Sequence, residues 1–133
     1  MLSRQKEQPR IVYTFALVRR EDNKLIGSCG ITIRSEPNKE AEMGYILNKS
    51  HWNQGYTTEA ANRLMRFGFQ QLGLHRIYAT CDPANVASFK VMEKIGMKRE
   101  GLLRQHKLEK GKWRDSLLYS ILEQEMTFTE QKS

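Results

Sequence analysis

Apolar positions along the chain fall into short runs separated by turn residues, and one longer stretch is periodic. Runs of strand length occupy residues 11–18, 25–33 and 41–47, and the polar segment between the first two carries Asp22 and Asn23. Short apolar and β-branched runs bounded by turn residues are typical of strands. We therefore predict an antiparallel hairpin followed by a third strand.

The stretch after the third strand has the spacing of an amphipathic helix. Its predicted core face recurs at intervals of three and four residues and consists of Ala61, Leu64, Met65, Gly68, Phe69 and Leu72. Polar side chains occupy the other face, apart from Phe67, to which this pattern assigns no role. The helix is predicted to begin near Thr57 and to end before Gly73, a residue type suited to the left-handed position that often follows a helix.

The next two elements continue the alternation of strand and helix. Residues 76–81 are a short strand-like run, and residues 86–95 have the pattern of a second helix. Asn85 is the predicted N-cap of this helix, because its side chain can accept a hydrogen bond from the first turn. Gly96 is predicted to end it.

Two last strands are predicted at residues 98–108 and 113–122, with a glycine in the turn between them. The element order is therefore β-β-β-α-β-α-β-β. A crossover helix implies that the third and fourth strands are parallel, whereas the rest of the sheet should be antiparallel. The chain is predicted to be one α/β (α+β) domain with a mixed sheet over residues 11–125, with an extension at 1–10 and a flexible tail at 126–133.

The composition is consistent with one globular domain of 133 residues, since 39% of them are hydrophobic and 28% are charged. No apolar run is long enough to span a bilayer, and the N-terminus lacks the apolar segment of a signal peptide. We therefore expect a cytoplasmic protein that does not bind membranes. Cys29 and Cys81 lie far apart in strand-like runs, which favours reduced core thiols over a disulfide or a metal pair, and no metal site is predicted.

The net charge is +7, from 22 basic and 15 acidic residues, and it favours anionic partners such as nucleotides, RNA or acidic proteins. The basic residues are scattered, and the densest cluster, at 106–114, is too short to indicate nucleic-acid binding by itself. A basic protein with a solvated surface explains the charge equally well, so no direct nucleic-acid partner is predicted.

The segment HWNQGYTTEAANRLMRF, residues 51–67, begins its helix with small and polar residues. The first N–H groups of a helix have no partner within it, and with the helix dipole they form an anion-binding site. Gly55 allows a phosphate close to the backbone, and Thr57 and Thr58 are small and offer hydroxyls. The patterns GxxxxGK[ST] and GxGxxG are both absent. Two interpretations remain, a pyrophosphate cradle and an ordinary helix start capped by threonine.

Five segments in this order resemble the GNAT acetyltransferase superfamily, within it the branch of bacterial ribosomal-protein N-terminal acetyltransferases and spermidine acetyltransferases. The segments are LIGSCGI, AEMGYIL, WNQGYTTEA, HRIYATCDPANVASFKVMEKIGMKREGLLR and GKWRDSLLYSIL. The family's phosphate loop, Q/R-x-x-G-x-G/A, corresponds to residues 52–57. Tryptophan at its first position is usual in the ribosomal branch, and Thr57 replaces the final small residue.

The resemblance implies a set of residues that bind acetyl-CoA. The residues whose backbone would hold its pyrophosphate are Gln54, Gly55, Tyr56, Thr57 and Thr58. The backbone of Tyr45, Ile46 and Leu47 would face the pantetheine arm, where the third and fourth strands splay apart. Asn85 would bind this arm from the other side.

The resemblance also implies direct transfer of the acetyl group to a neutral amine, with the oxyanion stabilised by a backbone N–H near Leu47. Many family members donate a proton to the leaving thiolate from a tyrosine, where this chain has Met92, which cannot donate. Ser88 lies one helical turn earlier and is the predicted thiolate partner, with helix capping as the alternative. Glu42 is the best carboxylate candidate for the base, with a surface role as the alternative.

The expected function is an acetyl-CoA-dependent N-acetyltransferase whose acceptor is a protein N-terminal α-amine, as in the ribosomal-protein enzymes. The pKa of an α-amine is about 7.7–8.0, so it needs less help from a base than a lysine does. Three alternatives remain open: a polyamine or other small amine as the acceptor, a catalytically silent acyl-CoA-binding module, and a small basic RNA-binding protein.

Chains of this family normally begin with a strand and two helices before the run equivalent to 11–18, and only about ten residues precede that run here. Those two helices usually wall the acceptor site. The predicted fold lacks them, so the sheet is expected to expose an apolar face, which a homodimer would cover.

Overall fold

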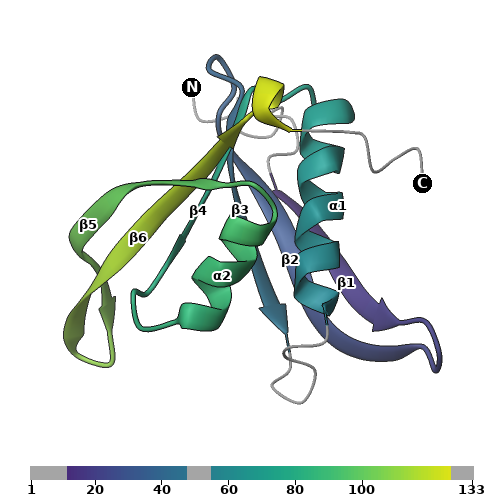
Figure 1. The fold of residues 1–133 in the computed structure, drawn as a ribbon, viewed down its shortest axis with the longest axis horizontal. Helices are drawn as coiled ribbons and strands as arrows, with labels where there is room; N and C mark the ends of the chain where they lie inside the picture. The colour runs from purple at the N-terminus through teal and green to yellow at the C-terminus, as the bar shows by residue number, and fades with distance from the viewer. Residues whose placement is uncertain (1–11, 48–54, 127–133) are drawn as a thin grey trace, which may run out of the picture.

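The computed structural model describes residues 12–47 and 55–126, which form a mixed six-stranded sheet with two helices on one face (Figure 1). The elements are β1 (Val12–Arg19), β2 (Lys24–Ser35), β3 (Glu40–Leu47), α1 (Tyr56–Gln70), β4 (Arg76–Cys81), α2 (Val86–Lys94), β5 (Lys98–Glu109), β6 (Lys112–Leu122) and the 3-10 turn η3 (Glu123–Glu125). The predicted fold class and the order β-β-β-α-β-α-β-β are confirmed. Within residues 12–47 and 55–126, η3 is the one element without a counterpart in the predicted order.

The strand order across the sheet is β1-β2-β3-β4-β6-β5. β3 and β4 are parallel, as the crossover helix predicts, and the other neighbouring pairs are antiparallel. The parallel register covers only residues 40–42 of β3 and 76–78 of β4. Beyond these residues β3 stays paired with β2, and β4 stays paired with β6. The two strands therefore diverge toward their C-terminal ends, which confirms the predicted splay.

The core lies between the sheet and the helices. The buried face of α1 consists of Ala61, Leu64, Met65, Gly68 and Phe69, as the periodicity predicts. Leu72 does not extend this face within the helix, because α1 ends at Gln70. Phe67 also has a role that helical spacing alone does not show. Its ring makes edge-on contacts with Tyr13 and Phe15 of β1, with centroids 5.7 and 5.3 Å apart.

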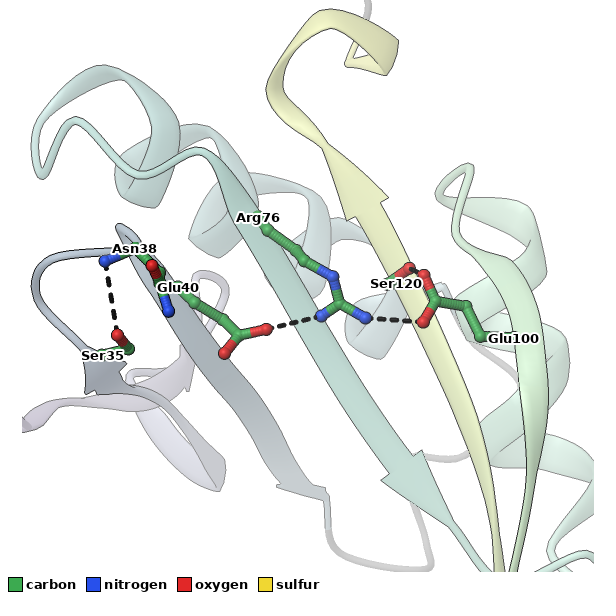
Figure 2. Close-up of polar contacts among 6 residues, drawn as sticks. All are labelled: Ser35, Asn38, Glu40, Arg76, Glu100 and Ser120. Atoms are coloured by element: carbon green, nitrogen blue, oxygen red, sulfur yellow. Dashed lines mark hydrogen bonds and ion pairs between the residues drawn. The ribbon is translucent and has the colours of Figure 1, made fainter.

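The sheet face away from the helices carries a row of ion pairs. Side chains alternate along a strand, so Arg76 lies opposite the buried Ile77, on this outer face. Its guanidinium donates to Glu40 of β3 (Nη1–Oε2 2.8 Å) and to Glu100 of β5 (Nη2–Oε1 2.6 Å). Glu100 also accepts a hydrogen bond from the hydroxyl of Ser120, and Figure 2 shows these side chains converging from neighbouring strands. The expectation of an apolar exposed face is wrong for this part of the sheet.

The end of the described chain is tied into the core. Met126, which the sequence assigned to a flexible tail, is 7% exposed and packs within the hydrophobic cluster. The predicted extension at 1–10 lies outside the described residues. Cys29 and Cys81 are buried and free, which confirms the prediction of reduced core thiols. Among the residues that the structure describes, no helix is long and apolar enough to cross a membrane.

Candidate functional site

A cleft of about 360 Å³ opens where β3 and β4 diverge. The end of β3, the first turn of α1 and one face of α2 form its walls. These elements meet because α1 follows β3 and α2 follows β4, so both helices begin at the end of the sheet where the strands separate (Figure 1). The cleft brings together six residues predicted from the sequence, namely Tyr45, Ile46, Thr57, Thr58, Asn85 and Ser88.

Among the residues that the structure describes, no side chain caps the first turn of α1. Its N-cap residue is Gly55, which adopts the left-handed conformation with φ of 81° that glycine tolerates without strain. Thr57 and Thr58 are helical residues that line the cleft, so the threonine-capped start is excluded. The helix dipole and the first amides of α1 therefore give this wall of the cleft an affinity for anions.

Asn85 and Ser88 occupy the start of α2. The Asn85 Oδ1 atom accepts a hydrogen bond from the Ser88 backbone N–H at 3.1 Å, which confirms the predicted cap. Capping uses the oxygen of the side-chain amide, and the nitrogen carries two further N–H donors at the cleft wall.

Tyr45 reaches from β3 to α2. Its hydroxyl lies 3.2 Å from the carbonyl oxygen of Ser88 and 3.2 Å from its Oγ atom. Burial raises the pKa of Tyr45, and the hydrogen bond with Ser88 offsets only part of that shift, so the phenol stays protonated at neutral pH. The sequence predicted only a backbone role for Tyr45, because strand periodicity does not show which helix a strand side chain touches.

Sequence reasoning missed the other residues of α2 that line the cleft. Ala87, Lys90, Val91 and Lys94 also line the cleft, and their spacing of three and four residues places them on one helical face. Lys90 and Lys94 bring two positive charges to the same cleft as the start of α1. The sequence shows that Ala87, Lys90 and Lys94 share one face of a helix. It does not show that this face lies beside the start of α1.

The donors of the cleft are amides, hydroxyls and ammonium groups. Among residues 12–47 and 55–126, no group of three or more His, Cys, Asp or Glu side chains is arranged to hold a metal ion. Cys81, at the end of β4, interacts with Ser88, but burial dominates and raises the pKa of its thiol. The site is therefore suited to binding a phosphorylated ligand and to hydrogen-bonding chemistry.

Four of the predicted cofactor-binding residues are absent from the described lining of the cleft, and one of them is Gly55, the N-cap of α1. Tyr56 lines a separate depression beside the β1–β2 hairpin, together with Arg19 and Arg63. Leu47 ends β3, where its backbone is in register with Gly27. Gln54 lies outside the described residues.

Glu42 is absent from the described lining of the cleft. Its Oε1 atom accepts two hydrogen bonds from Arg34 of β2, from Nε at 3.1 Å and from Nη2 at 2.9 Å. The neighbouring Ala41 and Met43 are buried, so alternation along β3 places Glu42 on the outer face of the sheet. This arrangement favours a surface ion pair over the role of a base in the cleft.

Known proteins share this sequence pattern and this fold. A family model described as an acetyltransferase (GNAT) domain matches residues 1–98. The uncharacterized N-acetyltransferase YnaD of Bacillus subtilis is 38% identical over 111 residues, which are 84% of this chain. The chain spans 65% of the length of YnaD and so corresponds to part of that relative.

Solved structures give the same result. The crystal structure of an acetyltransferase (GNAT family) from Bacillus anthracis matches with a TM-score of 0.78 and 38% identity, over 84% of this chain and 67% of that one. The ribosomal-protein-S5-alanine acetyltransferase from Vibrio fischeri matches with a TM-score of 0.82 and 26% identity, over 95% of this chain and 68% of that one.

Proposed function

Because the chain belongs to the GNAT acetyltransferase family, we propose that it binds acetyl-CoA in the cleft between β3 and β4 and transfers the acetyl group to a primary amine. One observation carries this proposal. The start of α1, the end of β3 where it has left β4, and the Asn85–Ser88 turn of α2 all border one cleft.

The residues of the cleft fit the chemical groups of acetyl-CoA. The first amides of α1 and the ammonium groups of Lys90 and Lys94 are suited to the negative charge of a diphosphate. Asn85 and the β3 backbone beyond Glu42 offer hydrogen-bonding groups to the amides of a pantetheine arm. When bound, acetyl-CoA supplies a thioester carbonyl that an amine can attack.

The chain itself then has two tasks in the reaction. A backbone N–H near the end of β3, where the strand has left β4, is the proposed donor to the oxyanion. The Ser88 hydroxyl lines the cleft and is the proposed donor to the departing sulfur. Met92 takes no part, because it is 2% exposed and packs in the core.

A protein N-terminal α-amine is the proposed acceptor. The described residues that line the cleft include no carboxylate and no imidazole, so an acceptor that is already partly neutral suits the site. With a pKa of about 7.7–8.0, roughly a tenth of an α-amine is neutral at pH 7, against less than about one part in a thousand for a lysine amine near 10.4. The likeness to a ribosomal-protein-S5-alanine acetyltransferase supports the same acceptor class.

The acceptor can be tested by incubating the protein with acetyl-CoA and a panel of amines, followed by mass spectrometry. The panel contains peptides with free N-termini, the same peptides with blocked N-termini and an internal lysine, and spermidine. We expect acetylation of the free α-amines. A product with spermidine alone would replace the proposed acceptor with a polyamine, and binding of CoA without any product would indicate a silent acyl-CoA-binding module.

Two glycine variants test whether the start of α1 binds the cofactor in this reaction. Gly55 and Gly73 flank the same helix, both have positive φ (81° and 67°), and a Cβ atom would meet no other atom within 4 Å at either one. Gly55→Ala and Gly73→Ala therefore introduce similar backbone strain, but only Gly55 lies at the cleft end. We expect Gly55→Ala to raise the KM for acetyl-CoA about tenfold or more, as loss of hydrogen bonds to a charged group would, and Gly73→Ala to leave it unchanged. Equal KM values for the two variants would contradict the proposed role.

A further inference from the structure

We propose that Tyr45 is a positioning residue for acetyl transfer, because its hydroxyl contacts the Ser88 hydroxyl and can hold it ready to donate to the leaving sulfur. This inference rests on the proposed function. The chemistry of the thiolate does not by itself require a tyrosine on β3. The role follows from the contact that the Tyr45 hydroxyl of β3 makes with Ser88 of α2. Both side chains line the cleft, and the two oxygen atoms lie 3.2 Å apart.

The hydrogen bond between Tyr45 and the Ser88 side chain can run in either of two directions, and the Cys81 thiol interacts with the same Ser88 hydroxyl. The phenol carries one proton, and the Ser88 carbonyl oxygen, also 3.2 Å away, can only accept. If the phenol donates to the carbonyl, the Ser88 hydroxyl donates back to Tyr45. If the phenol donates to Ser88 Oγ, the Ser88 proton is released and can point into the cleft.

Negative charge in the cleft selects the second arrangement. A departing thiolate attracts the Ser88 proton, and a hydrogen bond from Tyr45 to Oγ polarises the serine hydroxyl and strengthens its donation. The backbone N–H of Ser88 is already fixed by the Asn85 cap, so the serine has little freedom apart from rotation of its side chain. Tyr45 thus converts a rotating hydroxyl into a directed donor.

The pair donates hydrogen bonds and keeps its protons. The phenol of a tyrosine has an ordinary pKa of about 10, and burial raises the pKa of Tyr45 further. The phenol therefore keeps its proton at neutral pH and acts as a hydrogen-bond donor. In the balanced reaction the amine nitrogen forms a bond to the carbonyl carbon, the C–S bond breaks with its electron pair remaining on sulfur, and water accepts the amine proton and later protonates the thiolate.

The test uses Tyr45→Phe, Ser88→Ala and the double variant, with Tyr119→Phe as a matched control. Tyr119 also joins a strand to α2 through its hydroxyl, which donates to Glu93 at 2.6 Å, but it does not line the cleft. The control therefore removes the same hydroxyl group and a similar contact outside the site. Steady-state kinetics gives kcat and KM. A pH titration of thiolate absorbance, with unacetylated coenzyme A bound to the protein, gives the pKa of its thiol.

We expect Tyr45→Phe to lower kcat about three- to tenfold, as loss of one hydrogen bond in a charged network would, with little change in the KM for acetyl-CoA. The same substitution should raise the pKa of the bound thiol, because a donor to sulfur favours the thiolate. In the Ser88→Ala background it should have almost no further effect on either quantity, because Tyr45 acts through Ser88. Tyr119→Phe should match the wild type.

Two results would overturn the inference while leaving the proposed function intact. One is a Tyr45→Phe variant with wild-type kcat and an unchanged thiol pKa. The other is a loss of kcat of the same size with and without Ser88, which would show that Tyr45 acts structurally. If the wild-type protein neither binds coenzyme A nor transfers acetyl groups, the proposed function itself fails, and the inference fails with it.

Discussion

Arg76 joins three strands that are separate in the sequence, because Glu40 and Glu100 approach its guanidinium from two sides. Glu100 in turn accepts the hydrogen bond of Ser120, a residue that is only 4% exposed and whose hydroxyl would otherwise lie buried without a partner. The network thus satisfies a buried polar group and ties the parallel and antiparallel parts of the sheet together (Figure 2).

Glu100 makes the stability of the protein depend on pH. The Ser120 hydrogen bond, followed by the Arg76 guanidinium, holds the pKa of Glu100 below its ordinary value of 4.5. A lowered pKa in the folded state adds stability that is fully present above pH 4.5 and is lost as the pH falls through the folded value.

We therefore expect Glu100→Gln to lower Tm by about 1–4 °C above that pH, a modest effect because the ion pair is partly exposed, and by progressively less at more acidic pH. Thermal unfolding across a pH series measures this difference. Glu36→Gln, in the exposed turn between β2 and β3, is the control. A difference in Tm that stays constant or grows toward acid pH would contradict the role of Glu100.

Single residues were predicted from the sequence where a local rule applies to them. Asn85 was placed correctly as a cap because capping depends on neighbours within one turn. The contact of Tyr45 with Ser88 and the ion pair of Glu42 with Arg34 were not predicted. Both depend on which elements lie side by side, and that information is not present in the spacing of residues along one element.

The position of α1 illustrates the same limit for a whole element. Its buried face followed from periodicity, but its close approach to the sheet depends on Gly68. A Cβ atom at Gly68 would lie 2.9 Å from Ile77 Cδ1, 3.0 Å from Ile31 Cδ1 and 3.1 Å from Leu74 Cδ1. The missing side chain therefore lets the helix pack directly on β2 and β4.

Gly68→Ala tests this packing. Alanine gains up to about 1 kcal/mol of helix propensity over glycine, but overpacking costs about 1–3 kcal/mol, and three neighbouring methyl groups must shift at once. We expect a net loss of about 1 kcal/mol in the free energy of unfolding, measured by chemical denaturation. Ile77→Val removes the methyl group nearest to a Cβ atom at position 68 and so relieves the overpacking. It should therefore lower the free energy of unfolding clearly less in the Gly68→Ala background than in the wild type. Additive effects would show that the contact does not limit packing.

Across the whole molecule, the order of elements was predictable and the order of strands was only partly so. The crossover helix correctly predicted the parallel pair of β3 and β4. The insertion of β6 between β4 and β5 does not follow from the sequence order, although it places Ser120 between Arg76 and Glu100. The outer face also proved to be crossed by ion pairs, because Glu40 of β3, Arg76 of β4 and Glu100 of β5 come close together only in the assembled sheet.

The cleft is a property of the same assembly. Its three walls come from β3, α1 and α2, and no local pattern alone indicates that they meet. The resemblance to acetyltransferases supplied six of its residues, whereas Lys90 and Lys94 of α2 and the contact of the Tyr45 side chain became apparent only in the structure. The central claim is that this cleft, at the divergence of two parallel strands, is where coenzyme A binds.

An NMR titration of the isotopically labelled protein with coenzyme A tests that claim most directly, because backbone amide signals report the location of binding residue by residue. If coenzyme A binds in the cleft, the largest chemical-shift changes will cluster at Tyr45, Ile46, residues 55–58, Asn85 and Ser88, with little change in the β5–β6 hairpin. Changes centred on that hairpin or on the outer face of the sheet, or no changes at saturating coenzyme A, would contradict it.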